Sequence, residues 1–284
     1  MVRSIATLAA LSALALVAAP AQATGDDVRT HVSGHSAGGW KPHFRAARKF
    51  ARSRSGDVRI AVIDQFGRIN QLNGSRTAPM ASLFKALLLA TYLSQPGVRH
   101  RSLRESERDL LGPMIRRSDN AAATRVRDML GPGPIVAMTR KARMKDFSYK
   151  SVWGLSRTSA RDQARFFYRW DRFVPKRHER YARYLLSHIV PSQRWGFGRA
   201  RPKGWSLFFK GGWGVGTGRV NHQTALLEEG RCRLGISVMT EFSPSHGYGT
   251  RTIEGVAERL TRGIGQAHCG GRFAEGPAQA DPNS

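Results

Sequence analysis

Apolar residues recur along the chain with two different spacings, and the changes between them divide the chain into three parts. Residues 44–53 have the period of a helix, and 58–64 followed by 67–72 alternate as a β-hairpin does. The middle is helical in period, and after Gly204 the alternation of strands returns. The expected middle helices are 82–93, 103–115, 121–130, 159–170 and 176–189, and the later elements are strands 205–210, 219–227 and 232–242 and an amphipathic helix 250–264.

Both ends of the chain therefore contribute strands, which we expect to share one antiparallel sheet. The fold class is α/β (α+β), with a sheet lobe built from both termini, an inserted helical lobe and a cleft where they meet. We expect one folded domain over 44–269, preceded by a flexible linker over 24–43 and followed by a disordered tail over 270–284.

The first residues have the parts of a secretory signal peptide. A basic residue, Arg3, precedes an apolar run over 5–19, and Ala21-Gln22-Ala23 provides small residues for cleavage after Ala23. The apolar run is too short to span a bilayer comfortably, and no second run follows it. The expected mature protein is exported, soluble and monomeric, with no membrane span.

The charge is strongly basic. Forty-six Lys and Arg against 20 Asp and Glu give a formal net charge of +26, so the surface should adhere to polyanions. The chain has no nucleic-acid-binding motif, which favours anionic cell-envelope polymers as partners; the alternative is a solvated Arg-rich surface without a specific partner. The nine His are scattered without metal-ligand spacing, so neither a metal nor a cofactor is expected.

Cys232 and Cys269 are the two cysteines of the chain. An even pair in an exported protein is most simply a disulfide. The expected strand after Cys232 and the helix before Cys269 run antiparallel, which brings the two residues together. Two buried free thiols are the alternative.

The first chemical motif is Ser82-Leu83-Phe84-Lys85. Its serine and lysine lie one helical turn apart, so Lys85 could take the hydroxyl proton of Ser82 if burial lowers the lysine pKa. The run 83–93 is almost wholly apolar, which predicts that burial. Alternatively, Ser82 only caps the helix and Lys85 extends to the surface.

The second motif, Ser118-Asp119-Asn120, falls between two expected helices. The Ser118 hydroxyl could pass a proton to a leaving nitrogen, and the Asn120 amide could orient the substrate and Lys85. A structural reason is also sufficient, because Asp119 can cap the second helix.

The third motif, Lys210-Gly211-Gly212, is expected to end a strand and is followed by Trp213. Lys210 could bind a substrate carboxylate, and the glycines would let a substrate lie along the strand edge. The alternative is an exposed lysine before an ordinary turn.

In order and placement, the three motifs resemble those of the class A beta-lactamase and penicillin-binding-protein superfamily of serine hydrolases, over roughly 44–264. The resemblance implies that Ser82 is acylated, that Lys85 serves in its activation and that Ser118 relays a proton. The expected function is a secreted serine acyl hydrolase that forms an acyl-enzyme with beta-lactams or D-Ala-D-Ala-like peptides.

The resemblance also implies a substrate-binding set. Asn120 would position the substrate, and Lys210 would support the serine of the second motif and bind a carboxylate. Gly212 would border the substrate, and the backbone amides of Trp213 and Ser82 would form an oxyanion hole.

Two departures from the family pattern bear on this function. Gly211 replaces a hydroxyl residue that would meet the substrate carboxylate, and Arg219, His222 or Gln223 could compensate. The stretch 141–157 lacks the glutamate that activates water in class A enzymes, and its one acid is Asp146. We therefore expect acylation followed by slow deacylation.

Two other functions remain open. Ser36, in Gly34-His35-Ser36-Ala37-Gly38, fits the nucleophile elbow of α/β-hydrolase esterases, although no strand precedes it. The fold could also be a non-catalytic cell-wall or peptide-binding module with a decayed site.

Overall fold

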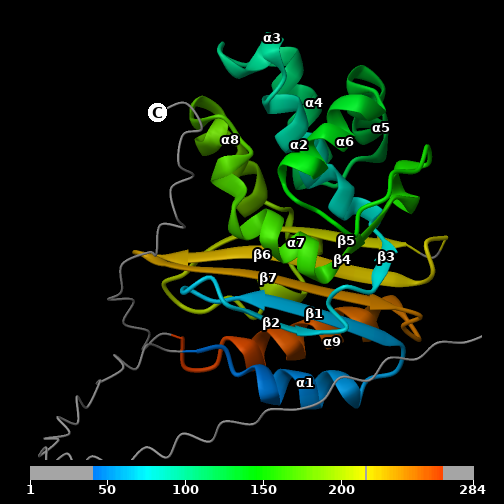
Figure 1. Ribbon diagram of the computed structural model, residues 1–284, viewed down its shortest axis with the longest axis vertical. Helices are drawn as coiled ribbons and strands as arrows, with labels where there is room; N and C mark the ends of the chain where they lie inside the picture. The colour runs from blue at the N-terminus through cyan, green and yellow to red at the C-terminus, as the bar shows by residue number, and fades with distance from the viewer. Residues whose placement is uncertain (1–40, 215, 265–284) are drawn as a thin grey trace, which may run out of the picture. The chain divides into compact units, whose positions relative to one another are not determined.

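The two ends of the chain form one five-stranded antiparallel sheet, with strand order β2-β1-β7-β6-β5 (Figure 1). The computed structural model describes residues 41–214 and 216–264. The sheet strands are β1 (Asp57–Ile63), β2 (Ile69–Leu72), β5 (Ser206–Gly214), β6 (Val220–Glu229) and β7 (Cys232–Glu241). Because β1 pairs with β7 along its whole length, the expectation of one sheet built from both termini is confirmed.

The sheet is covered by helices on both faces. Figure 1 shows α1 and α9 on one face and the remaining helices on the other. The helices are α1 (Phe44–Arg52), α2 (Phe84–Leu93), α3 (Pro96–Arg99), α4 (Glu105–Arg116), α5 (Asn120–Leu130), α6 (Pro132–Lys141), α7 (Ala160–Tyr168), α8 (Lys176–Ser187) and α9 (His246–Leu260). Coverage of both faces explains why β1 is buried from Val58 to Ile63 rather than alternately exposed.

Helix α2 lies at the centre of the inserted helical segment. All ten of its residues are buried, as is typical of a helix that is apolar on every side. Its N-terminus continues a short 3-10 helix, η1 (Ala81–Leu83). The expected single helix over 82–93 is therefore two elements, and Ser82 belongs to the tighter first turn.

A second, two-stranded sheet holds the segment before η1. Strand β3 (Thr77–Pro79) pairs with β4 (Arg157–Ser159). These strands and helix α6 are absent from the sequence-based expectations, because three-residue strands have no readable period and Pro132-Gly133-Pro134 obscures a helix start. Four further 3-10 helices are η2 (Trp153–Leu155), η3 (Trp170–Arg172), η4 (Pro191–Gln193) and η5 (Gly196–Gly198).

Two of the expected elements had wrong boundaries. Strand β5 does not end at Lys210 but runs to Gly214, because Gly211 and the residues after it continue the pairing with β6. Helix α9 spans His246–Leu260 rather than 250–264, and it begins early because the Ser245 side chain accepts a hydrogen bond from the Tyr248 amide and caps the helix.

Several expectations lie outside the described residues. They include the signal peptide, the linker as far as residue 40, Ser36, Cys269 and the tail. Cys232 is buried at the start of β7, and its pairing with Cys269 stays a prediction. None of the helices in the described ranges is long and apolar enough to cross a membrane.

Candidate active site

The segment that carries Ser82 is fixed on two sides. The Met80 amide donates to the Ser156 carbonyl at 2.7 Å, and the His222 ring lies 3.0 Å from the Pro79 carbonyl. Ala81 has a φ of 45°, a left-handed conformation that is unusual for a residue with a side chain. The turn over residues 79–82, which we call the Ser82 turn, is therefore held in a strained shape by neighbouring elements.

Lys85 is completely buried beneath this turn, as expected. Its Nζ lies 2.8 Å from Ser82 Oγ, 2.7 Å from the Ser118 carbonyl and 2.7 Å from Asn120 Oδ1. Burial lowers the lysine pKa to about 7, against an opposing influence of the Asp119 carboxylate. A neutral amine can donate to the carbonyl and amide oxygens while its lone pair accepts the Ser82 proton.

Ser118 joins the two lysines of the site. Its Oγ lies 3.1 Å from Lys85 Nζ and 3.0 Å from Lys210 Nζ. The residue has a φ of 58°, and the Asp119 side chain that follows accepts from the Ala122 amide and caps α5. The loop motif thus supplies a helix cap and a bridging hydroxyl at once.

Lys210 is fully buried on β5. Burial lowers its pKa well below the usual value, and the positive charge of Lys85 lowers it further. Its Nζ donates to Ser118 Oγ and to the Gly211 carbonyl. Among the described residues, neither lysine has a carboxylate hydrogen-bond partner, so the pair is held by neutral oxygens.

Strand β5 lies directly against the Ser82 turn at Gly212. A Cβ atom placed there would be 3.0 Å from the backbone atoms Ser82 N, Met80 O and Leu83 N. Glycine permits this close approach, because a Cβ atom would crowd the backbone of a turn that is hydrogen-bonded on two sides.

The side chains meet at a pocket of about 230 Å³. The residues that line it come from the Ser82 turn, the α4–α5 loop and the start of α5, η2, and the end of β5 with the turn after it: Ala81, Ser82, Ser118, Asn120, Trp153, Gly154, Trp213 and Thr217. Lys85 and Lys210 lie beneath this lining, where both contact Ser118 and Lys85 also contacts Ser82 and Asn120. The structure therefore brings together the residues of all three motifs.

Four of these wall residues escaped the sequence analysis: Ala81, Trp153, Gly154 and Thr217. Trp153 stacks on Phe84 with 6.2 Å between ring centroids and lies 4.9 Å from Lys85 Nζ. Thr217 lies in the turn between β5 and β6, and its hydroxyl donates to the Gly214 carbonyl. The aromatic side chain of Trp153 in the loop 141–157 was the available signal in the sequence.

Asp146 does not enter the pocket. Its carboxylate accepts from Ser159 Oγ at 2.6 Å and forms an ion pair with Arg161 at 2.9 Å. Among the described residues that line the pocket, none is acidic. The loop of Asp146 instead contributes Trp153 and Gly154.

Two of the three residues that could compensate for Gly211 are engaged within the fold. Gln223 is buried and binds the Trp195 carbonyl and the Phe197 amide. His222 points to the face opposite that of Gln223, where it is buried against the Pro79 carbonyl. In an antiparallel strand, neighbouring side chains point to opposite faces, and both faces are covered here.

Arg219 remains available to a substrate. It is exposed, has a φ of 51° and lines a second pocket of about 180 Å³. Trp213 lines both this pocket and the pocket of Ser82. No group of three His, Cys, Asp or Glu within the described ranges could hold a metal ion.

A serine held against a buried lysine, in a pocket between a sheet and an inserted helical segment, defines a serine hydrolase of the beta-lactamase type. The family model described as "Beta-lactamase enzyme family" matches residues 100–264, and the chain belongs to this family. The match includes Ser118, Asn120 and Lys210; Ser82 and Lys85 precede it.

Solved structures share the fold at low sequence identity. The beta-lactamase from Sphaerobacter thermophilus is 18% identical, with 79% of this chain and 99% of that chain covered and a TM-score of 0.68. The class A beta-lactamase from Mycobacterium abscessus is 17% identical, with 78% and 99% covered and a TM-score of 0.65. PBP-A is 14% identical, with 78% and 96% covered and a TM-score of 0.65. No curated protein sequence matches the chain.

Proposed function

We propose that Ser82 is the nucleophile of an acyl transfer and that Lys85 is its base. The observation that carries the proposal is the 2.8 Å contact between Lys85 Nζ and Ser82 Oγ, made by a buried lysine whose pKa is lowered to about 7. At neutral pH about half of such a lysine is unprotonated, which is the form that can accept the hydroxyl proton.

The reaction that this geometry supports forms one ester and breaks one amide. Ser82 Oγ bonds to the carbonyl carbon of the substrate while its proton passes to Lys85. The carbon–nitrogen bond then breaks, and the leaving nitrogen receives a proton through the Ser118 hydroxyl. The backbone amides of Ser82 and Trp213 stabilise the oxyanion formed on the way.

The proposed substrates are beta-lactams or D-Ala-D-Ala-like peptides, which carry a carboxylate near the reacting amide. Arg219 supplies positive charge for that group, and Lys210 can donate a hydrogen bond toward it. Asn120 orients the acyl side, and Gly212 lets the substrate lie along β5. Thr217 supplies a hydroxyl at the end of the strand whose motif lacks one at Gly211.

We further propose that the acyl-enzyme is released slowly. Hydrolysis of the ester needs a base that activates water. The pocket lining contains no acid among the described residues, and Asp146 is already engaged by Ser159 and Arg161. The proposed setting is outside the cytoplasm, after removal of the signal peptide at Ala23.

The test is covalent labelling of the full-length protein by a fluorescent penicillin. Labelling is expected in the wild type and in Ser36→Ala, lost in Ser82→Ala and reduced at least about a hundredfold in rate in Lys85→Ala. After removal of free label, the adduct should persist, and nitrocefin should give a burst followed by slow turnover.

Each alternative has its own outcome in this experiment. Esterase activity that depends on Ser36 would support the nucleophile elbow. Absence of labelling by any beta-lactam or ester probe would support a non-catalytic binding module. Rapid turnover of nitrocefin that depends on Ser82 would contradict slow release while leaving the nucleophile in place.

A further inference from the structure

Helix α1 presents a row of cations that the catalytic pocket does not use. Arg45, Arg48, Lys49 and Arg52 occupy positions i, i+3, i+4 and i+7, and all four are exposed. The opposite side of the helix is buried through Ala47 and Ala51, which fixes the direction of the four charges. We call these four residues the basic ridge.

The basic ridge is not neutralised within the described part of the chain. None of its members takes part in an ion pair there, whereas Arg59 of β1 and Arg76, just before β3, both contact Asp57. Like charges four residues apart on a helix repel one another by a few tenths of a kcal/mol. Binding of an anionic ligand would relieve this repulsion, so the repulsion favours binding.

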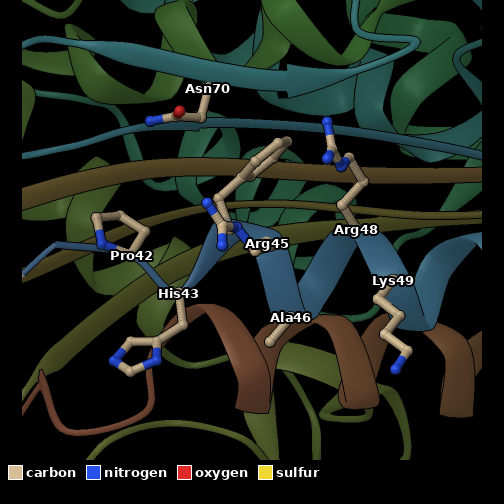
Figure 2. Close-up of a pocket in the computed structure, with 8 residues that line it drawn as sticks. Pro42, His43, Arg45, Ala46, Arg48, Lys49 and Asn70 are labelled. Atoms are coloured by element: carbon tan, nitrogen blue, oxygen red, sulfur yellow. The ribbon is translucent and has the colours of Figure 1, made fainter.

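The ridge borders a hollow of about 620 Å³ between α1 and the edge strand β2. Figure 2 shows Arg45, Arg48 and Lys49 along α1, with Asn70 of β2 on the other side of the hollow. β2 pairs with β1 and is one of the two edge strands of the described sheet. The hollow thus combines guanidinium groups, an amide and an open strand edge, all able to donate hydrogen bonds to anions.

The chemistry of the ridge favours phosphate. Three of its four cations are arginines, whose planar guanidinium groups bind phosphate oxygens in pairs. The row extends over about 10 Å of helix, which suits consecutive charges of a linear polymer better than a single small anion.

The position of the ridge is compatible with catalysis. Figure 1 shows α1 and α9 on one face of the sheet and α2 with the other helices of the site on the opposite face. Gly255 allows α9 to pack closely on α1, since a Cβ atom there would lie 2.6 Å from the Phe50 ring. A polymer on α1 would therefore leave the pocket of Ser82 open.

We infer that the basic ridge of α1 binds a phosphodiester-linked polyol polymer of the cell envelope and holds the enzyme at its substrate. The choice of an envelope polymer over a nucleic acid rests on the proposed function. It is also favoured by the absence of a fully exposed aromatic side chain on α1 for base stacking: Phe44 and Phe50 are both half-buried.

The experiment measures binding of the full-length protein to purified poly(glycerol phosphate). The test variant carries Arg45→Gln, Arg48→Gln, Lys49→Gln and Arg52→Gln. The matched control carries four changes at exposed cations of the helical segment: Arg125→Gln, Arg140→Gln, Lys141→Gln and Lys145→Gln. Both variants lose four positive charges, and thermal unfolding checks that both fold.

We expect the test variant to bind at least about tenfold more weakly than wild type and the control to stay within about threefold. The salt dependence of binding should also be shallower in the test variant, because fewer counterions are released. Equal losses in both variants would overturn the inference, since affinity would then follow net charge alone. Absence of wild-type binding would overturn it as well.

A duplex DNA of about 30 base pairs is the second probe. Tighter binding to DNA than to the polymer, with the same loss in the test variant, would overturn the choice of partner and indicate a nucleic-acid surface.

Penicillin labelling of Ser82 in the same samples keeps the two proposals separate. Failure of labelling with polymer binding intact would contradict the proposed function and not the ridge.

Discussion

At the scale of single residues, the site contains two buried lysines that have no carboxylate hydrogen-bond partner among the described residues. Lys85 and Lys210 share the Ser118 hydroxyl. Burial lowers the pKa of both side chains. Removal from water disfavours the ammonium form. A residue that ordinarily serves as a surface cation can therefore act as a base near neutral pH.

The acylation rate should follow the protonation of Lys85. With a pKa of about 7, the lysine is neutral above that pH and charged below it, so the rate should fall as pH decreases. We expect a plateau above about pH 8 and an approach to a tenfold fall per pH unit below about pH 6. Penicillin labelling rates across this range measure it, and a flat profile would exclude Lys85 as the base.

At the scale of elements, β5 is a strand shaped by the turn that it touches. Gly212 faces the backbone of η1, and Gly211 faces the ring of Trp195, where a Cβ atom would lie 3.2 Å from Trp195 Cζ2. The two neighbouring glycines therefore make room for different groups. Gly212 leaves space for the backbone of the Ser82 turn, and Gly211 leaves space for the indole ring of Trp195.

Replacement of each glycine by alanine should separate these two contacts. Gly212→Ala adds a methyl group against three fixed backbone atoms and should displace Ser82, with an acylation rate at least about tenfold lower. Gly211→Ala is the matched control in the same strand, and its rate should stay within about threefold because a side-chain ring can shift. Equal effects on the rate would show that the approach at Gly212 does not position the nucleophile.

At the scale of the whole described molecule, His222 connects the central sheet to the segment that leads into the helices. Its Nδ1 accepts from the Thr240 amide, so Nε2 carries the proton and donates to the Pro79 carbonyl. This neutral tautomer is completely buried, and burial lowers the pKa of His222 to about 4.

Stability should therefore decline in weak acid through His222. The unfolded chain binds a proton at this histidine below about pH 6.5 and the folded chain only below about pH 4, so stability falls as pH decreases between these values. The full loss is about 3 kcal/mol. Urea unfolding of His222→Gln should show a correspondingly shallower decline, and His100→Gln, at an exposed position, should decline like wild type. Parallel curves for all three proteins would contradict this assignment.

The sequence by itself determined the features that depend on local pattern. The apolar run of α2 implied that Lys85 is buried, and the spacing of Ser82 and Lys85 implied that they meet on one turn. The alternating segments at both ends implied a shared sheet. These inferences held because the period of a helix, the alternation of a strand and the contact between side chains one turn apart all depend on residues that are close together in the chain.

Contacts between distant segments were decided by the tertiary structure. Trp153 and Thr217 enter the pocket from loops that have no period, and His222 and Gln223 turn into covered faces of the sheet. The extension of β5 beyond Lys210 depends on pairing with β6. Such features follow from which side chain fills the space beside another segment, and packing decides that after the chain has folded.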